Sequence, residues 1–180
     1  STPQQGIVLY YLIAIVVAFL LLNLPFVHKP GVKVSPIDTL FVAVSGISVT
    51  GLTPVSIIDT YSSFGQLIIL IILNIGGIGV MAIGTVLWVV LGKHIGMRER
   101  QLIMLDNNKD TMSGTVKLII EIVKTIMTIE IVGALLLAFY FYRDNPDLKN
   151  ALMQGLFVSI SATTNGGLDI TGQSLVPYAK

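Results

Sequence analysis

The chain contains no cysteine and few charged residues. Charged side chains make up 12% of its 180 residues, and the formal net charge is +1. The lack of cysteine excludes disulfide bonds and thiolate metal sites, although it leaves the redox compartment undetermined. The near-neutral charge provides no basic stripe for nucleic acid. Because 53% of the residues are hydrophobic and the mean hydropathy is +0.83, the composition predicts an integral membrane protein rather than a soluble domain.

Signatures of enzymes are also absent from the sequence. It contains no Walker or dinucleotide-binding motif, no HExxH, no GxSxG, and no close pair of aspartates within an apolar segment. The two histidines, His28 and His94, fall at opposite membrane edges in the topology described below, so a shared metal site is not expected. We therefore predict a protein that is not an enzyme and that has no cofactor.

Three apolar segments are long enough to cross a bilayer as helices, which takes about 20 residues. They cover Gly6–Val27, Phe64–Gly92 and Leu118–Tyr142. The first lacks a basic leading region and a small-residue cleavage site, so we interpret it as a retained span rather than a signal peptide. The second exceeds one perpendicular crossing, which predicts tilt or extension past the bilayer. Its glycines, Gly76 and Gly77 among them, predict close helix packing or a thin wall beside a pore helix.

A shorter apolar segment, FVAVSGISVTGLT, lies between the first two spans. Ser35 is a suitable N-cap and Pro36 suits the first helical position, so the pattern predicts a half-length helix through about Gly46. The small residues that follow cannot readily continue a helix. Pro54 stops a helix from resuming, and Val55–Ser63 is expected to be extended or irregular. Because non-helical backbone at membrane depth must be buried in protein or line a water-filled cavity, the segment predicts a re-entrant pore loop.

A second short apolar segment repeats this pattern. Leu148–Ala162 predicts another half-length helix, and TTNGGLD at Thr163–Asp169 follows it. Sliding the chain on itself by 116 residues, the offset between Phe41 and Phe157, aligns both loops and places the first span on the third. Matching loops and matching spans at one offset indicate an all-α membrane protein built from repeated helix–pore loop–helix units. The same offset pairs Val42 with Val158, Ser45 with Ser161, Gly51 with Gly167 and Leu52 with Leu168.

The repeat divides the chain into three parts. We expect a first span–pore loop–span repeat at residues 1–92, a cytoplasmic connector at 93–117, and the span and pore loop of a second repeat at 118–180. The connector has more basic than acidic residues, which marks the cytoplasmic side. The N-terminus would share that side, whereas the pore loops and the polar turn Arg143–Lys149 would face the other. The second repeat is incomplete without a closing span, so we expect further chain to supply one.

Several polar side chains fall inside or beside the predicted spans. Glu121 and Lys124 are three positions apart near a helix end, which favours a local surface pair. Glu130 is nearer the middle of its span, where it is either a functional group or a protonated partner in a hydrogen bond within the bundle. Asn74 is interpreted as a helix–helix hydrogen bond. Asp169, at the mouth of the second loop, either concentrates cations or caps a turn.

On these residues the sequence resembles the superfamily of Trk, Ktr and HKT potassium transporters, and most of all the bacterial Ktr membrane subunit. The resemblance rests on VTGLT after the first short helix, NGGLD after the second and NIGGIG in the second span. It covers nearly the whole chain, as roughly the first two of four repeats. The subunits of this superfamily are similar to four covalently joined copies of the potassium-channel unit, with one filter glycine in each loop.

The resemblance implies a selectivity filter whose glycines are Gly51 and Gly167. Plant relatives that favour sodium carry serine at the first position, so Gly51 suggests potassium. Around the second glycine the family pattern has alanine and phenylalanine, whereas this chain has Gly166 and Leu168. Glycine also suits a filter because it adopts dihedral angles that disfavour a side chain. The expected filter residues, which would bind potassium through backbone carbonyls, are Val49, Thr50, Gly51, Asn165, Gly166 and Gly167.

The resemblance also implies partners and a location. Proteins similar to this chain form dimers and sit on a cytosolic nucleotide-binding ring. We therefore expect a multi-pass protein of the bacterial cell membrane that assembles with the two remaining repeats of the same protein, with a second copy as a homodimer, and with a regulatory ring subunit. Potassium would move downhill or under the influence of sodium. No nucleic-acid partner is expected.

Two other functions stay open besides potassium uptake. A secondary carrier with re-entrant hairpins would bind a small solute at the midplane, but that architecture predicts inverted repeats. The repeat here has an even number of crossings between its copies and should be parallel. A non-transporting assembly subunit would share the whole fold, so only a conductance or uptake assay separates it from a transporter.

Overall fold

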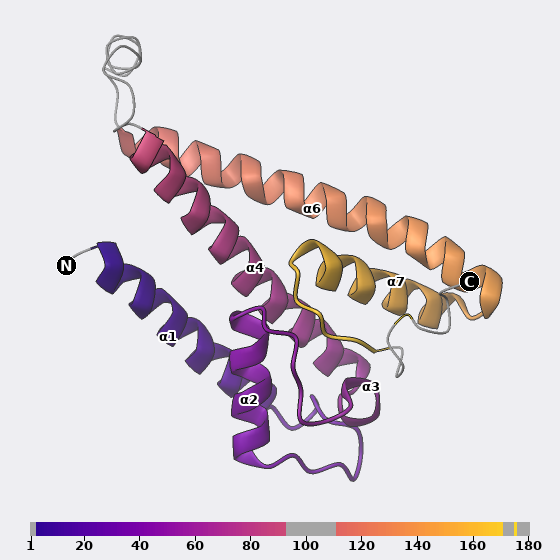
Figure 1. Cartoon of the computed structure of the whole chain (residues 1–180). Helices are drawn as coiled ribbons and strands as arrows, with labels where there is room; N and C mark the ends of the chain where they lie inside the picture. The colour runs from indigo at the N-terminus through magenta and orange to yellow at the C-terminus, as the bar shows by residue number, and fades with distance from the viewer. Residues whose placement is uncertain (1–2, 93–110, 171–174, 176–180) are drawn as a thin grey trace. The chain divides into compact units, whose positions relative to one another are not determined.

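The computed structural model describes residues 3–92, 111–170 and 175, and regular structure within them is helical (Figure 1). The chain forms two compact units, Ser1–Gly77 with Ile129–Lys180 and Ile78–Thr128. The predicted all-α fold class is confirmed. The helices in the described residues are α1 (Pro3–Leu22), α2 (Pro36–Ile47), α3 (Ile57–Thr60), α4 (Ser63–Gly92), α6 (Thr111–Asp144) and α7 (Leu148–Thr163).

Among the described residues, three helices are long and apolar enough to cross a membrane. The qualifying stretches are Gln4–Leu22, Ser63–Gly84 and Val116–Asp144, so the three predicted spans are confirmed. The apolar surface of α1 points outward, with Leu12 56% and Leu20 61% exposed. Side chains of this kind are stable in lipid and unfavourable in water. The chain is therefore a multi-pass membrane protein.

α2 is the predicted half-length helix, and its first turn follows from its sequence. Ser35 is extended, and its Oγ accepts a hydrogen bond from the Asp38 backbone N–H at 3.2 Å. Pro36 occupies the first turn, where a backbone N–H is not needed. Asp38 adds negative charge near the helix N-terminus, which the macrodipole favours. The helix continues one residue past Gly46 and ends at Ile47.

The first span ends earlier than the predicted limit of Val27. α1 stops at Leu22, where the Asn23 side chain turns back and its Nδ2 donates to the Phe19 carbonyl at 2.8 Å. Pro25 follows and has no backbone N–H with which to continue the ladder. The apolar run continues beyond these residues, so hydropathy alone places the end of the helix too late.

The segment Val55–Ser63, which the sequence predicts to be extended or irregular, includes a short helix. It contains α3, a single turn closed by a 3.0 Å hydrogen bond from the Thr60 N–H to the Ser56 carbonyl. Ser63 is already the first residue of α4. A four-residue helix is shorter than the window over which helical periodicity becomes visible, so the sequence does not indicate it.

The third long helix extends past both of its predicted ends. α6 begins at Thr111, inside the predicted connector 93–117, and ends at Asp144, inside the predicted turn Arg143–Lys149. Backbone hydrogen bonds continue a helix through polar residues at the membrane edge, where the apolar pattern has already stopped. The rest of the connector, residues 93–110, lies outside the described residues.

The core of the first unit joins both short helices to two long ones. α2 packs against α1, beside which it stands in Figure 1, and α7 contributes Phe157, which is 0% exposed. Leu168 and Ile170, which follow α7, enter the same core. Burial of these side chains holds the ends of α2 and α7 in one region. Further members of the core are Ala18, Leu22, Val42, Ile47, Ile69 and Leu73.

The turn after α1 is joined to the start of α4. The Ser62 N–H donates to the Val27 carbonyl at 2.9 Å, and His28 forms an isolated antiparallel bridge with Tyr61. Tyr61 is fully buried, and burial raises the pKa of its hydroxyl to about 12, with the Asp38 carboxylate adding to the rise. These contacts hold the turn between α1 and α2 against the start of α4.

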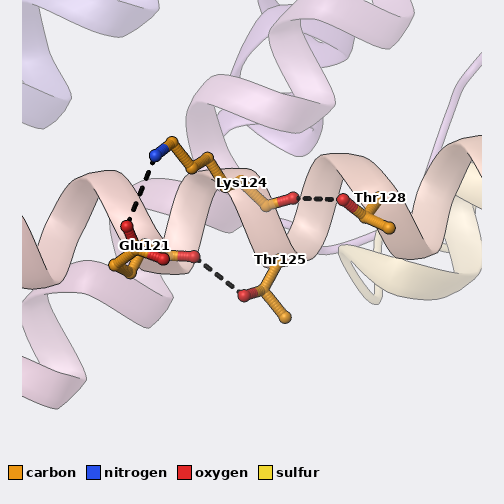
Figure 2. A network of polar contacts seen from close by, with 4 residues as sticks. All are labelled: Glu121, Lys124, Thr125 and Thr128. Atoms are coloured by element: carbon orange, nitrogen blue, oxygen red, sulfur yellow. Dashed lines mark hydrogen bonds and ion pairs between the residues drawn. The ribbon is translucent and has the colours of Figure 1, made fainter.

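Figure 2 shows a run of polar contacts along α6 in the second unit. Lys124 Nζ lies 3.4 Å from Glu121 Oε1, and the two side chains are 68% and 69% exposed. The hydroxyls of Thr125 and Thr128 donate to the backbone carbonyls of Glu121 and Lys124 at 2.8 Å. The predicted local surface pair is confirmed, and an exposed pair of this kind contributes little to stability.

Candidate pore-loop site

α2 ends in a Schellman motif, in which the chain folds back onto the last helical turn. The Thr50 N–H donates to the Ser45 carbonyl at 3.0 Å, and the Val49 N–H donates to the Gly46 carbonyl at 3.4 Å. Val49 has a φ of 58°, in a left-handed region that a β-branched side chain strongly disfavours. The motif therefore holds strain at Val49. Residues 48–53 are called the first pore loop below.

α7 ends in the same motif, displaced by 116 residues. The Gly166 N–H donates to the Ser161 carbonyl at 2.7 Å, and the Asn165 N–H donates to the Ala162 carbonyl at 3.1 Å. Asn165 has a φ of 60°, which asparagine tolerates better than valine does. The internal repeat thus extends from the sequence to individual backbone hydrogen bonds. Residues 164–169 are called the second pore loop below.

The two pore loops meet at their glycines. Gly51 and Gly167 have φ values of 79° and 67°, where a side chain is disfavoured. A Cβ atom placed on Gly51 would lie 2.6 Å from the Gly166 carbonyl oxygen and 3.1 Å from Gly167 Cα. A Cβ atom on Gly167 would lie 3.4 Å from Gly51 Cα. The structure therefore brings the two predicted filter segments together, and a side chain at Gly51 would not fit between them without movement.

The carbonyl oxygens at this junction have no donor within the part of the chain that the structure describes. Among the described residues, no N–H or O–H group donates to the carbonyl oxygen of any residue in 49–51 or 165–167. Thr50, Asn165 and Gly167 are exposed, so water can reach the backbone at these positions. Their oxygens can therefore accept hydrogen bonds from water or replace the water shell of a cation.

The hydrogen bonds that hydroxyl groups make at the ends of α2 and α7 were not predicted from the sequence. Ser48 Oγ donates to the Val44 carbonyl at 2.6 Å and lies 2.7 Å from Thr50 Oγ1. In the second repeat, Thr164 Oγ1 donates to the Ile160 carbonyl at 2.7 Å. The repeat offset would have found this pair, because Ser48 and Thr164 are hydroxyl residues 116 positions apart.

Glycines of α4 allow the ends of both short helices to come close. A Cβ atom on Gly76 would collide with the Ile47 carbonyl oxygen and would lie 2.8 Å from that of Gly46. A Cβ atom on Gly77 would lie 2.6 Å from Thr164 Cβ. The close packing predicted for NIGGIG is present at both glycines, and it places α4 against the start of each pore loop.

The two charged candidates have different surroundings. Glu130 is 2% exposed on α6, and when the Asn74 amide nitrogen faces it, Nδ2 lies 2.6 Å from Oε1 and 3.2 Å from Oε2. The Ser159 hydroxyl donates to the Glu130 backbone carbonyl at 2.7 Å. Glu130 thus links α6 to α4 through the helix–helix hydrogen bond predicted for Asn74. Its backbone carbonyl links α6 to α7 through the Ser159 hydroxyl. Asp169 lies in the second pore loop itself, half-buried, two residues after Gly167.

Relatives match this chain along almost its whole length. A family described as a cation transport protein, TrkH, matches residues 4–180. The Ktr system potassium uptake protein D of Bacillus subtilis is 49% identical over 98% of this chain and 39% of the relative. The potassium/sodium uptake protein NtpJ of Enterococcus hirae is 33% identical over 97% of this chain and 39% of the relative. The Ktr system potassium uptake protein B of Bacillus subtilis is 33% identical over 98% of this chain and 39% of the relative. The chain therefore spans well under half the length of these relatives.

Proposed function

Since the chain belongs to the TrkH cation transport protein family, we propose that it contributes two pore-loop repeats to a potassium uptake protein. The relatives named above are two potassium uptake proteins and a potassium/sodium uptake protein. One observation carries the proposal for this chain. Its two pore loops meet at Gly51 and Gly167, and the carbonyl oxygens of residues 49–51 and 165–167 have no donor among the described residues.

In the proposed mechanism, backbone carbonyls take the place of the water shell of a potassium ion. The Schellman hydrogen bonds draw the N–H groups of Thr50 and Gly166 back toward the helices, so these donors do not compete for the ion path. Neutral carbonyls bind a monovalent cation firmly enough to admit it and weakly enough to release it. The proposed ligands are the carbonyl oxygens of Val49, Thr50, Gly51, Asn165, Gly166 and Gly167.

Charged side chains act around this filter rather than within it. We assign Asp169, at the mouth of the second loop, the task of raising the local cation concentration. We assign Glu130 a supporting role, because a buried carboxylate in the membrane is costly and its neutral form can share a hydrogen bond with Asn74. The activity is transport of an ion, with no enzymatic step and no cofactor.

The assembly we propose follows the repeat. Residues 1–92 form the first repeat, 118–180 begin the second, and the connector 93–117 faces the cytoplasm. Two further repeats of the same protein would complete a ring of four loops in the bacterial plasma membrane. A second copy would form a homodimer, and a cytosolic nucleotide-binding ring would regulate transport through the connector. Uptake would be downhill or influenced by sodium.

Uptake of rubidium and sodium tests this function. Cells that lack their own potassium transport would express the whole gene product as the parent, as Gly51→Ser or as Gly167→Asp. Gly84→Ser is the matched control, because a Cβ atom on Gly84 would meet no atom within 4 Å. Surface expression is kept equal, and uptake of each ion is measured separately.

The parent is expected to take up rubidium in preference to sodium. Gly51→Ser should loosen this preference, because its Cβ atom would lie 2.6 Å from the Gly166 carbonyl oxygen and the loops must shift. Gly167→Asp should abolish uptake, and Gly84→Ser should behave as the parent. If the parent takes up neither ion, or if neither filter variant changes uptake, the pore function is wrong and the repeat is only a scaffold.

A further inference from the structure

Ser161 contacts the second pore loop at two points. Its backbone carbonyl accepts the Gly166 N–H at 2.7 Å, and its Oγ donates to the Leu168 carbonyl at 2.8 Å. The two partners flank Gly167 on either side. Ser161 is 6% and Leu168 is 4% exposed, so water does not compete for these bonds. One residue of α7 therefore holds the loop immediately before and after the filter glycine.

Ser45, the matching residue of α2, makes only the first of these contacts. Its backbone carbonyl accepts the Thr50 N–H at 3.0 Å. Its Oγ has no hydrogen-bond partner within the part of the chain that the structure describes, although the residue is only 2% exposed. Leu52, the counterpart of Leu168, is 60% exposed. Within the described residues the second hydrogen bond is therefore not made in the first loop, and Leu52 does not enter the core as Leu168 does.

We propose that the Ser161 hydroxyl is a positioning residue for ion selectivity, an inference that rests on the proposed function. The hydroxyl holds the Leu168 carbonyl back toward α7 and away from the ion path. With the Gly166 bond on the other side, it fixes the peptide groups next to Gly167. The first loop has a different contact, in which the hydroxyls of Ser48 and Thr50 lie 2.7 Å apart.

Removal of the Ser161 hydroxyl would leave the buried Leu168 carbonyl without a donor among the described residues, which is unfavourable. The peptide group can relieve this by rotating toward another donor or toward the ion path. Either rotation changes the number or spacing of the carbonyl oxygens near Gly167, on which selection between potassium and sodium depends. A purely structural hydroxyl would act differently, because its loss would lower the amount of folded protein and reduce uptake of both ions by the same factor.

The experiment measures the ratio of rubidium to sodium uptake for the whole gene product at equal surface expression. Ser161→Ala removes the hydroxyl. Ser161→Thr and Ser161→Val form a matched pair of nearly equal shape, of which only the first keeps a hydroxyl. Ser45→Ala is the control in the first repeat, because the hydroxyl that it removes has no partner among the described residues.

Ser161→Ala is expected to lower the ratio by about two- to tenfold, the range that corresponds to one net hydrogen bond. Ser161→Thr should stay nearer the parent than Ser161→Val, and Ser45→Ala should leave the ratio unchanged. If Ser161→Ala does not reach the membrane, the ratio in Ser161→Thr is compared with that in Ser161→Val to test the positioning role.

A ratio that is unchanged in Ser161→Ala, or equal in the threonine and valine variants, overturns the positioning role while the proposed function stands. If Ser45→Ala lowers the ratio as much as Ser161→Ala does, the proposed difference between the two loops is wrong. A parent without any preference for rubidium overturns the proposed function, and the positioning role with it.

Discussion

Glu130 is a buried acid whose protonation state decides its role. Its side-chain partner is Asn74, and no cationic side chain pairs with it in the described part of the chain. An unpaired carboxylate at membrane depth is costly, whereas the protonated form is neutral and can both donate and accept. The contacts therefore favour a neutral carboxyl group that joins α6 to α4.

Glutamine should replace Glu130 without loss of transport. Glu130→Gln keeps the length of the side chain and can still hydrogen-bond to Asn74, so we expect rubidium uptake close to that of the parent. Glu130→Ala leaves the Asn74 amide without its partner, and we expect a loss of about 1–3 kcal/mol in stability. Uptake in cells and thermal unfolding of the purified protein in detergent measure the two effects.

Glu121→Gln provides the control, because Glu121 is largely exposed and its pair with Lys124 contributes little. It should change neither uptake nor stability. Loss of uptake in Glu130→Gln at full surface expression would contradict the neutral role, and would show that the charged carboxylate takes part in transport.

Val49 shows where the sequence stops being informative about a single residue. The positive φ of Gly51 and Gly167 was predictable, since glycine suits this conformation and the repeat aligns the two positions. A left-handed Val49 was not predictable, because valine is disfavoured in that conformation. The motif is imposed by carbonyls of α2 that accept the N–H groups of the loop, and this is a property of the folded helix end rather than of the residue type.

At the scale of helices, the long spans and α2 were predictable, and the short connections were not. Apolar length alone identifies a membrane span, and Ser35 with Pro36 marks the start of α2. α3 and the first turns of α6 carry no such signal, because their sequences are short or polar. Their conformation depends on neighbouring structure, and sequence periodicity does not record it.

The packing of α4 against α2 predicts a difference between two glycines of the same helix. A Cβ atom on Gly76 would collide with the Ile47 carbonyl oxygen, whereas one on Gly84 would meet nothing within 4 Å. Gly76→Ala should therefore push the end of α2 and the first pore loop out of place. Overpacking of this kind typically costs about 1–3 kcal/mol, so we expect a lower unfolding temperature in detergent and weaker selectivity for rubidium.

Gly84→Ala is the matched control for this change. Alanine is a better helix former than glycine, so the variant should unfold at or slightly above the temperature of the parent and transport normally. Equal unfolding temperatures for Gly76→Ala and Gly84→Ala would show that α2 does not rest on Gly76 in the membrane.

At the scale of the whole molecule, the number of crossings determines how the two repeats are related. α1, α4 and α6 are each long and apolar enough to cross once, and in the proposed topology the pore loop between α1 and α4 returns to the side from which it enters. The turn that contains Lys33 and the turn that contains Asn145 should therefore lie on the same, outer side. The connector that contains Lys109 should lie on the cytoplasmic side, as its basic residues indicate.

Single cysteines can test this arrangement, because residues 1–180 contain no cysteine of their own. In a whole gene product without other cysteines, Lys33→Cys and Asn145→Cys should react with a membrane-impermeant maleimide on intact cells. Lys109→Cys should react only after the cells are permeabilised. If Lys33→Cys and Asn145→Cys react from opposite sides, the repeats are inverted and a carrier with re-entrant hairpins becomes the better interpretation. If both react from outside, the two pore loops enter the membrane from one side, which a filter shared by Gly51 and Gly167 requires.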